Sequence, residues 1–268
     1  MNEGSATSSA ASAKTSSHVR PGFNNIAPYI LVAGAERFIE FLKAAFEGTE
    51  RIRVPRPDGS IMHAEIGVGN SVIELSDASE QFTARQAFVH LYVDDADATY
   101  QRALHAGAKS VYGVEDQPWG DRQGCVKDEF GNVWYIATAK GWTPGPEGLP
   151  SVQPFLHLRN ADKMIPFAEA AFRAESLGVA KSDDGKVLHG TIRIGKATFE
   201  IDEANNDADV RPCYLHVYVP DADAIYAEAL RAGAVSVEPP IDKPYGERAA
   251  SVNDPFGNMW FLATYTGA

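Results

Sequence analysis

The sequence predicts an α+β protein that contains two tandem copies of one domain, each copy a pair of βαβββ units. Two observations support this prediction. The stretch DEFGNVWYIAT (128–138) recurs as DPFGNMWFLAT (254–264), and the same offset of 126 residues maps most of the first half onto the second without a gap. Within each copy, segments with strand-like and helix-like spacing of apolar residues follow one another in the order β, α, β, β, β, twice over.

The repeat and the composition define four parts of the chain. Residues 1–24 are rich in Ser, Ala and Thr and lack the apolar residues that would offset the entropy lost on ordering, so they are predicted to form a disordered tail. The first copy spans 25–140 and the second spans 152–268. Residues 141–151 lie within KGWTPGPEGLPS, whose prolines and glycines are typical of a linker.

The first unit of the first copy begins with a strand, YILVAG (29–34), and a helix, AERFIEFLKAAF (35–46), in which the apolar residues recur at helical spacing. Three strand-like segments follow it, namely RIRVPR (51–56), IMHAEIGV (61–68) and SVIELSD (71–77).

The second unit repeats this order. The strand FVHLYV (88–93) precedes the helix ADATYQRALHA (96–106), which Asp95 can cap and which Gly107 can end in the left-handed conformation. Three further strands are predicted, namely SVYGVED (110–116), RQGCVKD (122–128) and VWYIAT (133–138). The second copy repeats the same ten elements.

The hairpin at 61–77 indicates which side chains share a face. A two-residue turn at Gly69-Asn70 pairs Ile66 with Ile73 on an apolar face and Glu65 with Glu74 on the other. Repulsion between these two carboxylates would raise the pKa of one of them. The corresponding polar faces carry candidate acid/base residues that could move a proton next to a carbonyl group: His63, Glu65 and Glu74 in the first copy, and His189 and Glu200 in the second. A histidine that is simply hydrogen-bonded in a polar groove is the alternative.

Alternate residues of the strand FVHLYV are also expected on opposite faces of the sheet. Val89 and Leu91 are expected beneath the helices, whereas the alternate residues mix aromatic and polar character, as in the lining of a ligand cleft. The cleft-lining candidates are Phe88, His90 and Tyr92, with Tyr214, His216 and Tyr218 in the second copy.

Composition restricts the class of partner. The net charge of −12 argues against nucleic acid and against an anionic membrane surface, and no apolar run is long enough to span a bilayer. Two cysteines, Cys125 and Cys213, are too few and too far apart in the sequence for a disulfide framework or a CxxC metal site, and this fits a cytoplasmic protein. A small organic molecule is the expected partner.

The paired βαβββ pattern, with SVIEL, HLYVDDADATYQRALHAGA and PWGDRQGCVKDEFGNVWYIAT, resembles the glyoxalase/bleomycin-resistance/extradiol-dioxygenase superfamily, also called vicinal oxygen chelate, and within it the PhnB-like branch. The resemblance covers 26–138 and 152–265. It implies two tandem glyoxalase-like domains, each forming an open-sided curved sheet. It leaves open whether the copies pair with each other within the chain or with a second chain as a homodimer.

The resemblance also implies four positions per copy at which metal-dependent members place their ligands. Ala27, Glu74, Phe88 and Tyr135 fall there in the first copy, and Gln153, Glu200, Tyr214 and Phe261 fall there in the second. A catalytic transition metal needs about three protein donors. We therefore expect no metal and no cofactor, and we interpret Tyr135 and Phe261 as surfaces that hold an organic ligand. A displaced metal site that uses His90 or His216 is the alternative.

The loops before the seventh strand of each copy supply further candidates. Trp119 and Tyr245 could stack on a ligand ring, and Arg122 and Arg248 could pair with a ligand carboxylate. Alternatively the arginines have a structural role, bridging to Asp128 or Asp254. Trp134 and Trp260 are expected in the core.

These features predict a small-molecule-binding protein of the bleomycin-resistance type, without a catalytic metal, that sequesters its ligand. The alternative is an enzyme, either a lyase or isomerase that uses a His/Glu acid–base pair, or a metal-dependent glyoxalase or dioxygenase with shifted ligands. A fold shared by many chemistries does not decide between these functions.

Overall fold

The computed structural model describes residues 17–139 and 150–267, and these form four βαβββ units in the predicted order. Residues 1–16 of the predicted tail, residues 141–149 of the predicted linker, and residues 140 and 268 lie outside the described residues. The first copy comprises β1 (Ile26–Val32), α1 (Ala35–Phe46), β2 (Thr49–Pro55), β3 (Ile61–Val68), β4 (Ser71–Asp77), β5 (Phe88–Tyr92), α2 (Ala96–His105), β6 (Lys109–Asp116), β7 (Asp121–Lys127) and β8 (Val133–Ala139).

The second copy repeats this order and adds two short 3-10 turns, η1 and η2. Its elements are β9 (Val152–Leu158), η1 (Ala161–Lys163), α3 (Met164–Phe172), β10 (Glu175–Lys181), β11 (Val187–Ile194), β12 (Ala197–Glu203), η2 (Asp207–Asp209), β13 (Tyr214–Tyr218), α4 (Ala222–Arg231), β14 (Val235–Lys243), β15 (Glu247–Asn253) and β16 (Met259–Tyr265).

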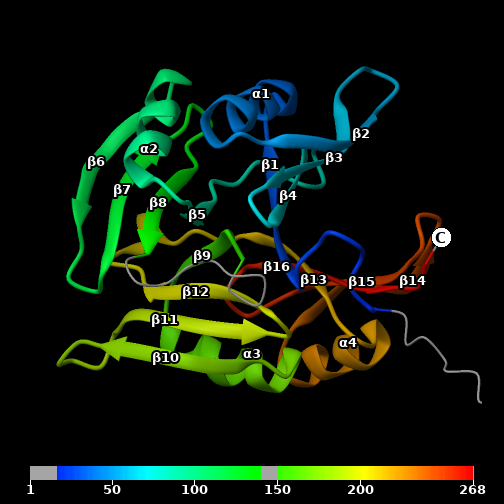
Figure 1. Ribbon diagram of the computed structural model, residues 1–268. Coiled ribbons are helices and arrows are strands. Elements are labelled where there is room, and N and C mark those ends of the chain that lie inside the picture. The colour runs from blue at the N-terminus through cyan, green and yellow to red at the C-terminus, as the bar shows by residue number, and fades with distance from the viewer. Residues whose placement is uncertain (1–16, 140–149, 268) are drawn as a thin grey trace, which may run out of the picture.

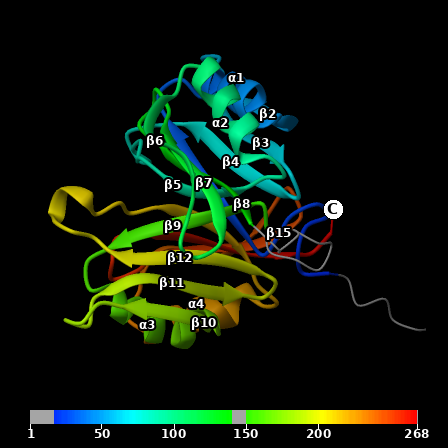
Figure 2. The ribbon, with the colours of Figure 1, turned by 60° about the vertical axis from the view of Figure 1, so that its left-hand side comes forward.

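The predicted α+β class and the βαβββ units are confirmed, and each sheet joins one unit from each copy. Sheet A has the strand order β14-β15-β16-β13-β1-β4-β3-β2, and sheet B has the order β10-β11-β12-β9-β5-β8-β7-β6. The two copies meet in antiparallel pairs, β1 with β13 and β5 with β9, which place Ala27 opposite His216 and His90 opposite Gln153. Figure 2 shows sheet B running from β6 at the top to β10 at the bottom.

The helices hold together the two units of each copy. In the first copy, one core contains α1, α2 and apolar residues of β1, β3, β4, β5, β7 and β8, with Phe38 and Trp134 fully buried in it. A second core contains α3, α4 and Trp260. The helix pairs lie at opposite ends of the molecule, at the top and bottom of Figure 1. The core positions predicted for Trp134 and Trp260 are confirmed.

The repeated Asp-x-Phe-Gly-Asn motif is a turn built around a buried carboxylate. Asp128 accepts hydrogen bonds from the backbone N–H groups of Phe130 and Asn132, from Asn132 Nδ2 and from Trp134 Nε1, all at 2.9–3.0 Å. The Asn132 side-chain oxygen in turn accepts from the N–H of Ala87, just before β5. Asp254 and Asn258 repeat these bonds. The motif therefore ties β8 to β5, and β16 to β13, next to the seam between the copies.

The turns of the hairpins β3–β4 and β11–β12 also form hydrogen bonds that connect the two copies. The turn Gly69-Asn70 forms two hydrogen bonds with Ser151, just before the second copy: Asn70 N donates to Ser151 Oγ at 3.3 Å, and Ser151 N donates to Asn70 Oδ1 at 2.7 Å. The equivalent turn donates from Lys196 N to Asn25 Oδ1 at 2.8 Å. Gly195 has φ +60°, and a Cβ there would lie 2.5 Å from Asn25 side-chain atoms, so glycine is required by both conformation and space.

Residues 17–24, at the end of the predicted tail, lie against sheet A. The His18 carbonyl accepts from Tyr265 N at 2.9 Å, and the Gly22 carbonyl accepts from Arg51 Nη1 at 2.9 Å. None of the described helices is long and apolar enough to cross a membrane.

We expect Gly195→Ala to lower the free energy of unfolding by about 2 kcal/mol or more, because it adds a close contact with Asn25 to the strain of a positive φ. Gly59→Ala is the matched control, since Gly59 has φ +86° and no atom within 4 Å of an added Cβ. Urea unfolding measures both. Equal losses of stability in the two variants would contradict a role for the contact between the Gly195 turn and Asn25 in holding the copies together.

Candidate functional site

The helix-free face of each sheet carries the polar side chains that the sequence places opposite the core. On β1, Ile30 and Val32 belong to the helix core, whereas the alternate residue Tyr29 points to the other face. We call the helix-free faces of sheets A and B face A and face B. Because the central strands of each sheet come from different copies, each face combines side chains from both.

Face B is centred on a buried ion pair between the copies. His90 Nδ1 on β5 lies 2.9 Å from Glu200 Oε2 and 3.1 Å from Oε1 on β12. Burial lowers the pKa of His90, but the Glu200 carboxylate raises it more, so the net pKa is above its ordinary value. Burial raises the pKa of Glu200, and His90 outweighs this effect and lowers it. Both directions favour the charged pair.

Face A repeats this pair with the copies exchanged. His216 Nδ1 on β13 lies 2.7 and 2.9 Å from the two carboxylate oxygens of Glu74 on β4. Burial lowers the pKa of His216, and the Glu74 carboxylate raises it to a net value above the ordinary one. Each histidine thus takes its carboxylate from the other copy.

The second ring nitrogen of His216 also faces a carboxylate. His216 Nε2 lies 3.8 Å from Glu247 Oε2, and Glu247 Oε1 accepts a hydrogen bond of 2.6 Å from the Tyr218 hydroxyl. All three groups are largely buried. Glu247 therefore places a second carboxylate within ion-pair distance of the His216 ring.

In face B the corresponding nitrogen, His90 Nε2, is buried and has no hydrogen-bond partner among the described residues. The residue equivalent to Glu247 is Asp121, whose side chain is one methylene shorter and which accepts from the Tyr92 hydroxyl at 3.4 Å. The pKa of Asp121 is raised, mainly by burial. Since Nδ1 donates to Glu200, Nε2 of the protonated ring has an N–H available for another acceptor.

Face A is covered by the chain itself. Arg20, in the segment before β1, lies 2.6 Å from Glu65 Oε1, and the ring of Phe23 packs edge-on against Tyr218 at 5.5 Å. His63 Nε2 lies 3.3 Å from the same Glu65 oxygen. Burial raises the pKa of Glu65, but His63 and Arg20 together lower it. The rise in pKa predicted from repulsion between the two glutamates is therefore wrong for Glu65, because its contacts with His63 and Arg20 outweigh burial.

Several residues that cover or line face A are replaced by residues of a different type at the equivalent positions of the second copy. Phe82, from the loop between β4 and β5, packs against Phe261 at 6.3 Å, and the equivalent residue is Ala208. Thr191 replaces Glu65. The residue equivalent to Arg20 is Pro146, which carries no charge and lies outside the described residues. The two faces therefore differ in chemistry despite the shared fold.

Aromatic rings line face B beside His90. The centroid of Tyr135 lies 5.4 Å from that of Phe155 and 6.5 Å from that of Phe88. Burial raises the pKa of Tyr135, so its hydroxyl stays neutral. His157 continues the wall, 4.6 Å from Phe155, with its Nδ1 2.7 Å from Asp202 Oδ1. Tyr135 and Phe261 both lie on the helix-free faces, where the sequence places them.

The structure brings together one of the two acid/base pairs predicted within a copy. His63 contacts Glu65, and its Nδ1 lies 3.2 Å from the Tyr29 hydroxyl. His189 is exposed and lies 3.4 Å from Thr191 Oγ1, whereas Glu200 is bonded to His90. The buried pairs join the copies, and sequence patterns within one copy do not show them.

The two arginines predicted in the loops before the seventh strands lie instead near the start of β7 and of β15, and form ion pairs with residues in the first turns of α2 and α4. Arg122 contacts Asp97 in the first turn of α2 and Asp116 on β6, so its guanidinium is held by structural partners. These partners differ from Asp128, the one considered from the sequence. Arg248 pairs likewise with Asp223 and Asp242. Trp119 and Tyr245, in the same loops, are 64% and 56% exposed and remain available for ligand contact.

The side chains at the positions implied for a metal do not fit one. Ala27 offers no side-chain metal ligand, and Gln153 Oε1 already accepts a hydrogen bond from the Thr198 hydroxyl at 2.6 Å. The carboxylates of Glu200 and Glu74 are each hydrogen-bonded to a histidine. In the part of the chain that the structure describes, no three His, Cys, Asp or Glu side chains converge as a metal site would require. The available donor set is therefore short of a catalytic metal centre.

Three comparisons relate this architecture to known proteins. The family model described as Glyoxalase/Bleomycin resistance protein/Dioxygenase superfamily matches residues 18–136. Uncharacterized proteins of Mycobacterium bovis and Mycobacterium tuberculosis are 38% identical over 122 residues, which is 41% of this chain and 80% and 72% of theirs. Glyoxalase I from Zea mays superposes with a TM-score of 0.71 at 16% identity, covering 89% of this chain and 92% of that one. The last likeness shows the fold alone.

We expect His90→Ala to lower the free energy of unfolding by about 3–5 kcal/mol, because it leaves the Glu200 carboxylate buried without its partner. Replacing both residues with leucine should cost less than the sum of the single changes. Arg173→Ala, which breaks an exposed pair with Glu228, is the control and should cost about 1 kcal/mol or less. A loss in His90→Ala no larger than in this control would contradict a buried ion pair.

The raised pKa values of His90 and His216 also predict a pH dependence. A histidine whose pKa is raised on folding contributes stability that is fully present below its unfolded pKa of about 6.5 and is lost as pH rises through the folded value. NMR titration of the histidine ring protons should show two midpoints above about 6.5, one of which disappears in His90→Gln and the other in His216→Gln. Midpoints below that value for both residues would refute the charged pairs.

Proposed function

We propose a function from the premise that the chain belongs to the Glyoxalase/Bleomycin resistance protein/Dioxygenase superfamily. Face B binds a small organic molecule that presents a hydrogen-bond acceptor, such as a carbonyl, carboxylate or phenolate oxygen, to His90 Nε2. The rings of Phe88, Tyr135 and Phe155 hold the body of the molecule. The protein serves to sequester this molecule in the cytoplasm, as a PhnB-like, bleomycin-resistance type of protein, without a catalytic metal.

One observation supports this proposal most directly, namely the buried Nε2 of His90 without a partner among the described residues. An unpaired buried polar atom costs about 1–3 kcal/mol, and a ligand acceptor would recover that cost. The Glu200 carboxylate fixes the orientation of the ring and its charge. The aromatic wall next to it offers surface to an organic group rather than donors to an ion.

The contrast between the faces supports one binding site per chain. In face A, Glu247 lies near the equivalent nitrogen, and Arg20 and Phe23 cover its neighbours. In face B the residues equivalent to Glu247, Glu65 and Phe82 are Asp121, Thr191 and Ala208. The ligand is therefore expected at His90 and not at His216.

A second candidate function is proton transfer on the bound molecule. A histidine with a raised pKa is a proton donor near neutral pH, so His90 could protonate a carbonyl oxygen while solvent water takes the proton from the adjacent carbon and Glu200 stabilises the ring. Deuterium exchange next to the carbonyl group of a bound ketone that depends on His90 would favour this enzyme over a sequestering protein.

We expect saturable quenching of the exposed Trp119 when hydroxyacetophenone, naphthol or naphthoate is titrated into the protein, with one site per chain. His90→Gln and Tyr135→Ala should each weaken binding about tenfold or more, since a hydrogen bond from a charged donor and a ring contact are lost. His216→Gln and Phe261→Ala are the matched controls on face A and should leave binding unchanged. Equal effects on both faces, or no quenching by any probe, would refute the proposal.

A further inference from the structure

A hollow of about 870 Å³ lies on the outside of the second copy, on the helix side of the sheets. It is lined by the segment between β9 and α3, by α3 itself, by the η2 loop and by the Asp-x-Phe-Gly-Asn turn before β16. Neither His90 nor His216 lines it, so it is separate from both faces.

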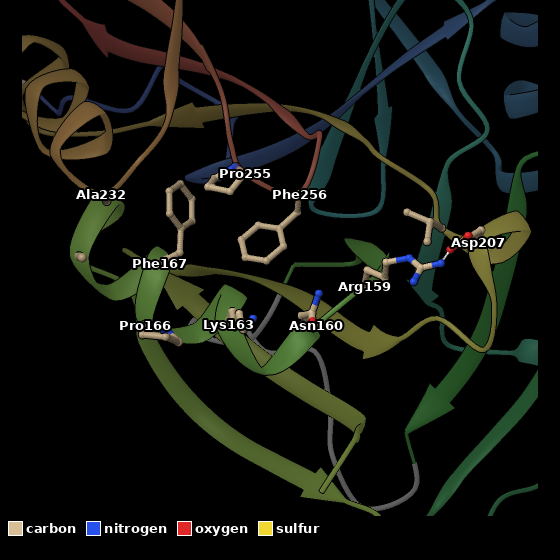
Figure 3. A pocket seen from close by; sticks show the side chains of 11 residues that line it. Arg159, Asn160, Lys163, Pro166, Phe167, Asp207, Ala232, Pro255 and Phe256 are labelled. Carbon is tan, nitrogen blue, oxygen red and sulfur yellow. Dashed lines mark ion pairs between the residues drawn. The ribbon is translucent and has the colours of Figure 1, made fainter.

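The wall of this hollow is mainly apolar. The rings of Phe167 on α3 and Phe256 in the turn meet edge to face, with centroids 5.9 Å apart. Figure 3 shows the two rings beside Pro255, with Lys163 and Asn160 below Phe256 and the paired Arg159 and Asp207 at one end. An apolar wall with a few polar groups at its edge suits an amphipathic ligand.

In the first copy, an ion pair occupies the place that corresponds to this hollow. There Arg37, equivalent to Lys163, lies 3.2 Å from the Glu129 carboxylate and over the ring of Phe130 at 5.5 Å. In the second copy the residue equivalent to Glu129 is Pro255. Lys163 thus keeps the positive charge of Arg37, whereas the carboxylate partner is replaced by a proline.

The Lys163 ammonium has no ion pair with any described residue. The other cation of the hollow, Arg159, already pairs with Asp207. The N–H groups of Asn160 and Ala161, at the start of η1, donate to the Glu203 carboxylate at 2.9 and 2.8 Å, so these donors are already occupied. Lys163 is therefore the group through which an anion would be recognised.

We propose that this hollow binds an organic carboxylate with an apolar body. The carboxylate takes the place that Glu129 has in the first copy and pairs with Lys163, and the apolar body lies on Phe167 and Phe256. This site is distinct from the one on face B, and the two can be tested separately.

Phenylbutyrate is the probe, and phenylbutanol, which keeps the ring and chain without the charge, is its matched neutral control. We expect saturable binding of phenylbutyrate with a dissociation constant on the order of 1 mM, as for a ligand of this size. Backbone amide shifts measured by NMR on the full chain should change at Phe167 and Phe256. The alcohol should bind about threefold more weakly or worse, because it lacks the ion pair.

Two variants test the role of the missing carboxylate. Pro255→Glu restores the residue of the first copy and should close the site by pairing with Lys163, and Lys163→Ala removes the cation. Each should weaken phenylbutyrate about threefold or more. Arg37→Ala, the equivalent change in the first copy, and His90→Gln on face B should leave the shifts at Phe167 and Phe256 unchanged.

Lys163 and Pro255 are exposed, so thermal melts of these two variants should match those of the native chain, and either variant alone is sufficient if the other fails to fold. Equal binding of the alcohol, unchanged binding in both variants, or shifts confined to the neighbourhood of His90 would each overturn the proposal. Absence of saturation up to about 10 mM would do the same.

Discussion

The antiparallel pairing of β1 with β13, and of β5 with β9, decides which polar side chains can meet. These hydrogen bonds lie between the copies, so the register that places Ala27 opposite His216 also brings the Glu74 carboxylate to that histidine. The same pairing in sheet B brings Glu200 to His90. Without it, each copy would hold a glutamate and a histidine on separate sheets, and neither buried ion pair could form.

The surrounding structure supports this register at several points. The buried carboxylates of Asp128 and Asp254 tie the last strand of each copy to the strand at the seam, and the hairpin turns at Gly69 and Gly195 bond to the first residues of the opposite copy. These are short, directional contacts with little tolerance for extra volume. They explain why the phrase Asp-x-Phe-Gly-Asn occurs twice, as a structural element next to the site rather than as part of it.

Sequence patterns predict the elements well because most of them depend on local periodicity. The hairpin pairs Ile66 with Ile73 and Glu65 with Glu74, as its turn residues indicate, Asp95 caps α2 through Ala98 N, and α1 has the predicted bounds. The choice of partner unit in each sheet is not local, since the same strands could pair within a copy or between copies. The ion pairs of His90 with Glu200 and of His216 with Glu74 follow from that choice. The contact of Arg20 with Glu65 is missed for a different reason, since it joins residues 45 apart in the sequence and Arg20 belongs to the predicted tail.

Placing both copies on one chain has a further consequence. A single copy could complete such a sheet only with a second, identical chain, and two-fold symmetry would then make the two faces the same. Covalent fusion removes that symmetry, so each face can change independently while the other keeps the assembly stable. The exchange of Glu65 for Thr191, of Phe82 for Ala208 and of Glu247 for Asp121 is a divergence of this kind, available to a duplicated gene but not to a homodimer.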